Sequence, residues 1–288
     1  MTTTSLASLS TDLAELKELS VGARQLILET VHTAGAGHIG GPLSVTDILV
    51  NLYFNRLRID PDSPRDPGRD RCILSKGHSS IALYSVLALR GYMPVEELAT
   101  FDAIDSRLQG HPDMSALPGL DMSTGSLGQG LSPGLGMALG GRLGNRDFRT
   151  WVILGDGEIQ EGQIWEAAFV ASRYRLSNLT AILDYNRLPQ FGWPDSSGFT
   201  RNEPIGDPGA KFAAFGWNIV ETDGHDHQAL TEAFDRVEQH TGGPTIVIAH
   251  TVKGKGVSFM ENDFNWHATP PNADQLAEAV AELQGSLR

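Results

Sequence analysis

Apolar residues along the chain follow two spacings, one typical of helices and one typical of buried strands. Over residues 11–34 the apolar side chains recur at helical intervals, which predicts a helix there. A second helix is expected to begin near Ser44, with Asp47 three residues later as a pair that resembles a capping box. Further amphipathic segments predict helices at 79–90, 131–143, 161–175, 226–240 and 272–284.

Short, nearly continuous apolar runs predict strands between these helices. They lie at 71–75, 150–155, 179–184, 216–221 and 245–250. Apolar strands separated by helices indicate a parallel sheet flanked by helices on both faces, and hence an α/β fold. Segments 105–126 and 186–208 are expected to be long loops, and loops of that length are usually functional.

The composition is that of an ordinary globular protein, with 40% hydrophobic and 20% charged residues. We expect residues 1–288 to form one domain, with a core over 10–270 and a C-terminal helix and tail over 271–288. A formal net charge of −13 argues against nucleic acid or a membrane as a partner, because both need a basic surface. The single cysteine, the lack of a long apolar run and the lack of a basic leader favour the cytoplasm.

Glycine is unusually frequent, at 32 of the 288 residues, and it is concentrated in bursts. Its usual share is about 7%. The bursts lie at 34–41, 124–136, 155–157 and 253–256. Glycine clustered beside apolar strands indicates main chain that is brought close to a ligand, rather than a flexible linker.

Two polar residues follow neighbouring strands of the predicted sheet. Asp156, in a Gly-Asp-Gly turn, follows the strand at 150–155, and Asn186 follows the strand at 179–184. The ends of such strands meet at one edge of a parallel sheet, which is where ligands bind. Asp and Asn offer hard oxygens that suit Mg²⁺ or Ca²⁺. Two protein ligands are too few for a complete shell, which suits a Mg²⁺ ion that also binds phosphate oxygens. Alone, the turn would be an ordinary strand end; with Asn186 at this spacing, a metal–diphosphate site is the better interpretation.

Several sequence motifs occur in the order found in one enzyme family. They are GHIGGPLSVTDILVNLYF at 37–54, RDRCILSKGHSSIALYSVLALRGY at 69–92, GHPDMSALPGLDMSTGSLGQGLSPGLGMAL at 110–139, LGDGEIQEGQIWEAA at 154–168 and TVKGKGVSFMENDFNWH at 251–267. On these motifs the chain resembles the N-terminal, diphosphate-binding half of a transketolase over nearly its whole length. The resemblance implies a thiamine diphosphate-binding fold, with thiamine diphosphate and Mg²⁺ (or Ca²⁺ or Mn²⁺) as cofactors.

The resemblance also implies which residues contact the cofactors. Asp156 and Asn186 would bind the metal through their side chains, and Leu188 through its main-chain carbonyl. Gly125 would meet the aminopyrimidine side of the cofactor, with Leu127 packed nearby. The other predicted cofactor contacts are His78, Gly155, Gly157, Glu161 and His267.

Four histidines in these motifs are predicted to be catalytic, namely His38, His78, His111 and His267. Ketol transfer moves protons onto and off sugar hydroxyls near neutral pH, where imidazole can both accept and donate. By the resemblance, His78 and His267 lie beside the diphosphate and the reactive carbon of the cofactor, while His38 and His111 face substrate hydroxyls. The other histidines considered, His32, His240 and His250, are interpreted as structural.

The activity that the resemblance implies is transfer of a two-carbon ketol unit from a ketose to an aldose. Transketolases have a second half that supplies a pyrimidine-binding domain and a C-terminal domain, and we expect these domains on a separate chain. We therefore expect a split enzyme, active only when two copies of this chain assemble with two copies of a C-terminal-type subunit. Glu161 and Glu166 match positions at that interface. Sugars or sugar phosphates are the expected substrates, but the motifs do not identify which.

Other interpretations stay open. Within the same cofactor chemistry, a 2-oxoacid dehydrogenase component or a deoxyxylulose-phosphate synthase-like enzyme is an alternative, although GHPD and TGSLGQG favour transketolase. DGHDH at 223–227 resembles the ligand run of a metal-dependent hydrolase, but Asp226 is better explained as the N-cap of the next helix. A non-catalytic relative is the remaining class. One departure from the family pattern bears on the pose of the cofactor, because Gln190, preceded by Pro189, stands where an aliphatic residue is usual.

Overall fold

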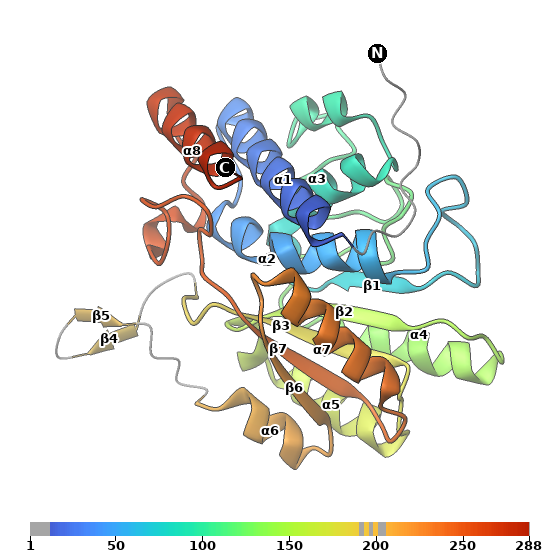
Figure 1. Cartoon of the computed structure of the whole chain (residues 1–288). Helices are drawn as coiled ribbons and strands as arrows, with labels where there is room; N and C mark the ends of the chain where they lie inside the picture. The colour runs from blue at the N-terminus through green and yellow to red at the C-terminus, as the bar shows by residue number, and fades with distance from the viewer. Residues whose placement is uncertain (1–11, 190–192, 196–197, 201–205, 288) are drawn as a thin grey trace.

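Five parallel strands form the central sheet of the computed structural model, in the order β1-β2-β3-β7-β6 (Figure 1). The strands are β1 (Arg71–Leu74), β2 (Thr150–Gly155), β3 (Leu179–Tyr185), β6 (Asn218–Asp223) and β7 (Thr245–His250). The structure describes residues 12–189, 193–195, 198–200 and 206–287. The predicted α/β fold is confirmed, and only β6 lies two residues later than the sequence pattern placed it.

Helices cover both faces of the sheet (Figure 1). One layer contains α1 (Leu13–Ala34), α2 (Gly40–Asn51), α3 (Ser80–Arg90), α7 (His227–Gln239) and α8 (Ala273–Gly285), and the other contains α4 (Leu131–Leu143), α5 (Gly162–Arg173) and α6 (Pro208–Ala214). Alternate residues of β2 enter the two cores, so that Trp151 and Ile153 pack in the first and Val152 and Leu154 in the second. Because both faces are buried, the strands consist of continuous apolar runs.

The second helix differs from the one that the sequence predicted. It begins at Gly40 rather than near Ser44, and Pro42 lies in its first turn, where no main-chain N–H is needed. Ser44 does not cap the helix, because its hydroxyl donates to the carboxylate of Asp184 at 2.6 Å. Asp47 forms an ion pair with Arg24 of α1 at 2.6 Å. The capping-box prediction is wrong because every residue of α2 is buried and both side chains bind partners inside the molecule.

One of the two predicted loops is confirmed. Segment 105–126 contains no helix or strand, whereas segment 186–208 contains an antiparallel pair, β4 (Trp193–Asp195) and β5 (Gly198–Thr200). Gln190 lies outside the described residues. Within the described part of the chain, no helix combines the length and the hydropathy that crossing a membrane requires.

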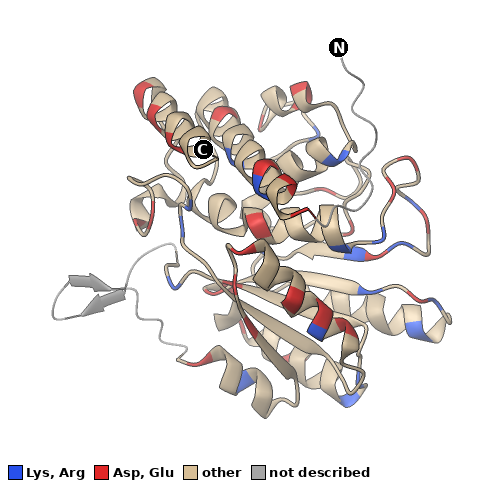
Figure 2. Ribbon diagram, viewed as in Figure 1, with Lys and Arg blue, Asp and Glu red and all other residues tan. Residues whose placement is uncertain are grey.

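Acidic side chains recur along the outer helices. Figure 2 shows Asp and Glu along α1, α7 and α8. On α8 these are Asp274, Glu278 and Glu282, and this helix carries no Lys or Arg. The outer helices therefore contribute to the formal net charge of −13.

The close approach of α4 to β2 gives a test of the packing. A Cβ atom at Gly134 would lie 2.5 Å from Cγ2 of Val152, whereas a Cβ atom at Gly136 of the same helix would meet nothing within 4 Å. We expect Gly134→Ala to lower the free energy of unfolding by about 1–3 kcal/mol, which is the usual cost of overpacking. The matched control, Gly136→Ala, should be neutral or stabilising by up to about 1 kcal/mol. Urea unfolding measures both, and equal stabilities would contradict this packing.

Candidate active site

The carboxyl ends of neighbouring strands meet at one edge of the sheet. Strands β2 and β3 pair so that Gly155 lies opposite Asp184. The chain that leaves these two ends carries Asp156 and Asn186, the two residues that the sequence placed at a metal site. The topology therefore brings them to the edge where ligands of parallel sheets bind.

Asp184, near the end of β3, is a buried carboxylate that joins three other segments. It accepts hydrogen bonds from Ser44 of α2, from Lys76 after β1 and from Thr251 after β7. Asp184 is 0% exposed and its ion-pair partner Lys76 is 2% exposed. This role was not predicted, although an acidic residue inside a buried apolar strand was an available signal.

The carboxylate of Asp156 lies within a tight turn formed by residues 186–188. Its Oδ1 accepts from the main-chain N–H of Gly157 at 2.8 Å, and its Oδ2 accepts from that of Arg187 at 2.5 Å. Asn186 accepts from the N–H of Leu188 at 3.0 Å, and Arg187 adopts a left-handed conformation, with φ of 62°. Asp156, Asn186 and Leu188 are all buried. The structure thus brings the three predicted metal ligands together, since Asp156 is hydrogen-bonded to the turn that carries Asn186 and Leu188.

The chemistry of these residues fits a hard divalent cation. Burial, with Asp184 as the second cause, raises the pKa of Asp156 to about 6. A nearby cation would favour the ionised carboxylate and lower that pKa. Carboxylate, amide and carbonyl oxygens are Mg²⁺ ligands. Mg²⁺ usually keeps several waters and binds phosphate oxygens besides one or two carboxylates, so three oxygens from the protein are enough for such a site. The described residues contain no group of three or more His, Cys, Asp or Glu that could hold a metal.

Glu158 joins three glycine-rich loops around the site. Its Oε1 accepts from the N–H of Gly128 at 2.9 Å and from the hydroxyl of Ser75 at 2.5 Å, and its Oε2 accepts from the N–H of Gly155 at 3.0 Å. Glu158 is 1% exposed, and burial raises its pKa. The sequence motifs did not single it out.

Two glycines allow these loops to approach each other closely. A Cβ atom at Gly77 would lie 2.6 Å from the main-chain carbon of Thr124, so the loop after β1 contacts the main chain of the TGSLGQG segment. A Cβ atom at Gly125 would lie 3.1 Å from the ring of His111. Space therefore requires glycine at position 77, where the neighbour is main chain, whereas at Gly125 a side chain would fit only if the exposed ring of His111 shifted by a few tenths of an ångström.

The four predicted catalytic histidines lie together around His38. The ring centroid of His38 is 5.0 Å from that of His78, 5.1 Å from that of His267 and 6.4 Å from that of His111. The rings of His78 and His267 are 5.5 Å apart. The structure thus brings the four residues into one cluster from separate segments of the chain, while their catalytic roles stay a prediction.

Burial keeps three of these imidazoles neutral. It lowers the pKa of His38, with His111 and Lys253 adding to the effect. It also lowers the pKa of His267, to about 3, and lowers that of His78 further. A neutral imidazole has one donor and one acceptor nitrogen, so these rings enter hydrogen bonds without a charge at neutral pH.

Lys253 connects the ring of His267 to the segment after β3. Its Nζ lies 2.9 Å from Nδ1 of His267 and donates to the main-chain carbonyls of Leu188 and Pro189, both at 3.0 Å. Lys253 is 2% exposed, and burial, opposed by Asp156, lowers its pKa to about 8. Its role was missed, although its place in a glycine burst was an available signal.

The predicted interface residues lie on the surface of this chain. Glu161 and Glu166 are exposed, and Leu127 is 36% exposed. A Cβ atom at Gly128 would lie 2.7 Å from Cβ of Glu161, so the TGSLGQG segment packs against the start of α5. The roles of Glu161 and Glu166 at an interface with a second chain stay a prediction.

Four of the other histidines contact other parts of the chain, namely His32, His225, His227 and His250. His32 lies 2.8 Å from the carbonyl of Pro271, and His250 lies 2.9 Å from Glu221. In the DGHDH run, Asp226 accepts from two main-chain N–H groups of α7, which confirms it as an N-cap. The two histidines of this run face Asp47 instead of forming a metal-ligand group.

The neutral state of His267 can be measured directly. Because burial lowers its pKa to about 3, its ring should stay neutral between pH 8 and pH 5, where the unfolded chain takes up protons near pH 6.5. The unfolded chain therefore binds one proton more than the folded chain below about pH 6.5, and the free energy of unfolding falls as the pH falls from there towards pH 3. Above about pH 6.5 both states are neutral at this residue, and the stability does not depend on its titration. NMR of ¹³C-labelled histidines follows the titration, with His267→Gln to assign the signal. A midpoint above pH 5 would contradict the burial of this ring.

Comparisons with known proteins agree with the motifs. Residues 17–285 match the family described as transketolase, thiamine diphosphate binding domain. The chain is 42% identical to 6-deoxy-6-sulfo-D-fructose transketolase subunit SqwG of Clostridium sp., over 91% of this chain and 93% of that protein. It is 41% identical to a subunit of the apulose-4-phosphate transketolase of Phocaeicola vulgatus, over 90% of each protein.

A solved structure gives the same answer for the fold. The crystal structure of transketolase from Campylobacter jejuni matches 95% of this chain with a TM-score of 0.86 and 30% sequence identity. The chain spans 43% of the length of that transketolase. By sequence and by fold, the chain belongs to the transketolase family and forms its thiamine diphosphate-binding domain.

Proposed function

We propose that the chain is the diphosphate-binding subunit of a split transketolase, an enzyme that moves a two-carbon ketol unit from a ketose to an aldose. Two relatives support this proposal, since the proteins from Clostridium and Phocaeicola are themselves named as transketolase subunits and match the chain over nearly their whole length. In this proposal residues 1–288 form a single domain, and a C-terminal-type subunit supplies the pyrimidine-binding and C-terminal domains.

The observation that carries the proposal is the placement of two groups at one edge of the sheet. The turn at 186–188 closes over Asp156, and the cluster around His38 lies beside it, because Lys253 contacts both Leu188 and His267. In our proposal the oxygens of this turn hold Mg²⁺, while Gly157 and His78 contact the diphosphate. Thiamine diphosphate, when bound, supplies the electron sink for breaking and forming the carbon–carbon bond.

The residues of this chain then orient the substrate and exchange protons. The neutral ring of His38 has one nitrogen that can accept a proton and one that can donate, as transfer to and from sugar hydroxyls requires. In His267, Nδ1 accepts from Lys253, so its free nitrogen Nε2 carries a proton and is a donor towards substrate. His111 is exposed and lies against Gly125, so it is placed to face substrate at the rim of the site. Lys253 fixes the ring of His267 by contacting its Nδ1.

The partner subunit is proposed to cover the exposed face that includes Leu127, Glu161 and Glu166. These residues flank the TGSLGQG segment, which would meet the aminopyrimidine side of the cofactor. An assembly with two copies of each chain would form two such composite sites. The cytoplasmic location also remains a proposal, which rests on the sequence.

The substrates are proposed only as a class. The relatives are named for 6-deoxy-6-sulfo-D-fructose and for apulose 4-phosphate, so closely related subunits act on ketoses with different charged groups. We propose a ketose or ketose phosphate as the donor and an aldose as the acceptor. The match to transketolases favours this reaction over that of a 2-oxoacid dehydrogenase component.

Reconstitution tests the proposed function. The purified chain is mixed with a C-terminal-type subunit of the same organism, Mg²⁺, thiamine diphosphate and a panel of ketose–aldose pairs, and the product sugars are measured. We expect turnover only in the mixture, because each chain alone lacks part of the site. Full turnover by this chain alone would refute the split-enzyme proposal.

Variants in the same mixture test the assignment of the histidines. His111→Ala should lower turnover by about 10²-fold or more, as expected for loss of a proton-transfer residue. His240→Ala, outside the cluster, is the matched control and should leave turnover unchanged. Equal rates for the two variants would show that His111 takes no part in proton transfer.

A further inference from the structure

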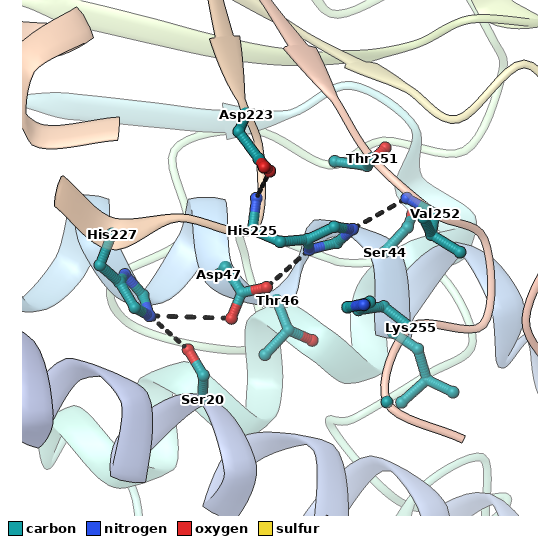
Figure 3. Close-up of polar contacts among 12 residues, drawn as sticks. Ser20, Ser44, Thr46, Asp47, Asp223, His225, His227, Thr251, Val252 and Lys255 are labelled. Carbon is teal, nitrogen blue, oxygen red and sulfur yellow. Dashed lines mark hydrogen bonds and ion pairs between the residues drawn. The ribbon is translucent and has the colours of Figure 1, made fainter. Parts of the chain in front are cut away.

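His225, in the DGHDH run, joins two segments that are far apart in the sequence. Figure 3 shows its ring between Asp47 of α2 and the main chain of Val252, which follows β7. Nδ1 of the ring lies 2.7 Å from Oδ2 of Asp47, and Nε2 lies 2.8 Å from the N–H of Val252. The main-chain N–H of His225 in turn donates to Asp223 at 2.8 Å, which fixes the base of the side chain.

The hydrogen bonds determine the proton position on this ring. Burial opposes ionisation of Asp47, but Arg24 and His225 outweigh it and hold the pKa of Asp47 well below its usual range. Arg24 binds both carboxylate oxygens, at 2.6 and 3.0 Å. An ionised Asp47 only accepts and the amide of Val252 only donates, so His225 carries its proton on Nδ1 and accepts at Nε2.

The segment that receives this hydrogen bond carries residues of the candidate active site. Thr251 donates to Asp184, and Lys253 contacts His267 and the carbonyl of Leu188. Val252 lies between them, so the bond from its amide to His225 restrains the main chain between these two residues. The segment is also held at its two sides, since the N–H of Thr251 donates to the carbonyl of Tyr185 and that of Gly254 donates to the carbonyl of Gly40. The bond to His225 is the one that acts on the residue directly before Lys253.

We propose that His225 is a positioning residue that acts through the main chain of Val252 to hold Lys253 against His267 and the carbonyl of Leu188. One consequence of this role rests on the proposed function, namely that a correctly placed Lys253 favours binding of thiamine diphosphate with Mg²⁺. The placement of Lys253 itself is a property of the chain without any cofactor. His225 thus links Arg24 of α1 and Asp47 of α2 to the site.

The two hydrogen bonds of His225 can be separated by substitution. An Asn side chain carries its polar atoms at the position of Nδ1, so His225→Asn keeps a donor for Asp47 and loses the acceptor for Val252. A Gln side chain reaches the position of Nε2, so His225→Gln keeps an acceptor for Val252. If His225 acts through its hydrogen bond with Val252, His225→Asn should disturb the position of Lys253 and His225→Gln should restore it.

A control on the opposite side of Asp47 tests for an indirect effect. His227 lies 3.7 Å from Oδ1 of Asp47 and 3.0 Å from the hydroxyl of Ser20, and Figure 3 shows both residues on the side away from Val252. Ser20→Ala removes a partner from this network and leaves the bond between His225 and Val252 intact. It should therefore behave as wild type in both measurements below.

The first measurement is the rate at which Lys253 is acetylated by isotopically labelled acetic anhydride in the cofactor-free chain, followed by mass spectrometry. Lys76 is the internal control, because it is equally buried, at 2% exposed, but is held by Asp184. We expect His225→Asn to raise the Lys253 rate by about tenfold, the effect of losing one hydrogen bond, with no change at Lys76. His225→Gln should stay within about threefold of wild type.

The second measurement is the affinity for thiamine diphosphate with Mg²⁺, by calorimetry on the full assembly. His225→Asn should weaken binding by about tenfold, as loss of a residue behind the binding shell usually does, and His225→Gln should restore it. Unchanged Lys253 labelling in His225→Asn, or an equal rise at Lys76, would overturn the proposal. If wild type itself fails to bind the cofactor, the proposed function is wrong, whereas the labelling result still tests the role of His225.

Discussion

The carboxylate of Asp184 is a charge within a buried strand, and the segments that satisfy it are those that form the site. Burying a carboxylate without partners is costly, so β3 can hold Asp184 only if donors reach it from elsewhere. Ser44, Lys76 and Thr251 supply them from α2, from the loop after β1 and from the segment after β7. Removing one partner of such a buried pair typically costs about 3–5 kcal/mol. The requirement to satisfy this charge therefore fixes the relative positions of three segments that carry site residues.

The same burial sets the protonation of the groups around it. It raises the pKa of Asp156 to about 6 and lowers that of Lys253 to about 8, so each group is closer to neutrality than an exposed counterpart. It also keeps the rings of His38 and His267 uncharged. Such perturbed values are typical of functional sites. A metal ion bound beside Asp156 would favour the ionised form of this carboxylate, which couples cofactor binding to the protonation of the site.

Much of this arrangement could be predicted from the sequence, because its signals are local. Continuous apolar runs predicted the strands, and the motifs predicted Asp156, Asn186 and the four histidines that the structure brings together. The roles of Asp184, Glu158 and Lys253 could not be predicted in this way, because each depends on partners more than 60 positions away or on contacts between loops. For the same reason the start of α2 was misplaced, since Ser44 and Asp47 bind tertiary partners instead of capping the helix. Interface roles for Glu161 and Glu166 depend on a second chain and remain predictions.

The central claim is that the turn at 186–188 and Asp156 form a metal–diphosphate site. Calorimetric titration of thiamine diphosphate into the assembled enzyme, with and without Mg²⁺, tests it most directly. Binding should require Mg²⁺ in the wild type and should be lost in Asp156→Ala and in Asn186→Ala, because each substitution removes an oxygen ligand from a six-coordinate ion. Unchanged affinity in both variants, or binding that is independent of Mg²⁺, would contradict the account.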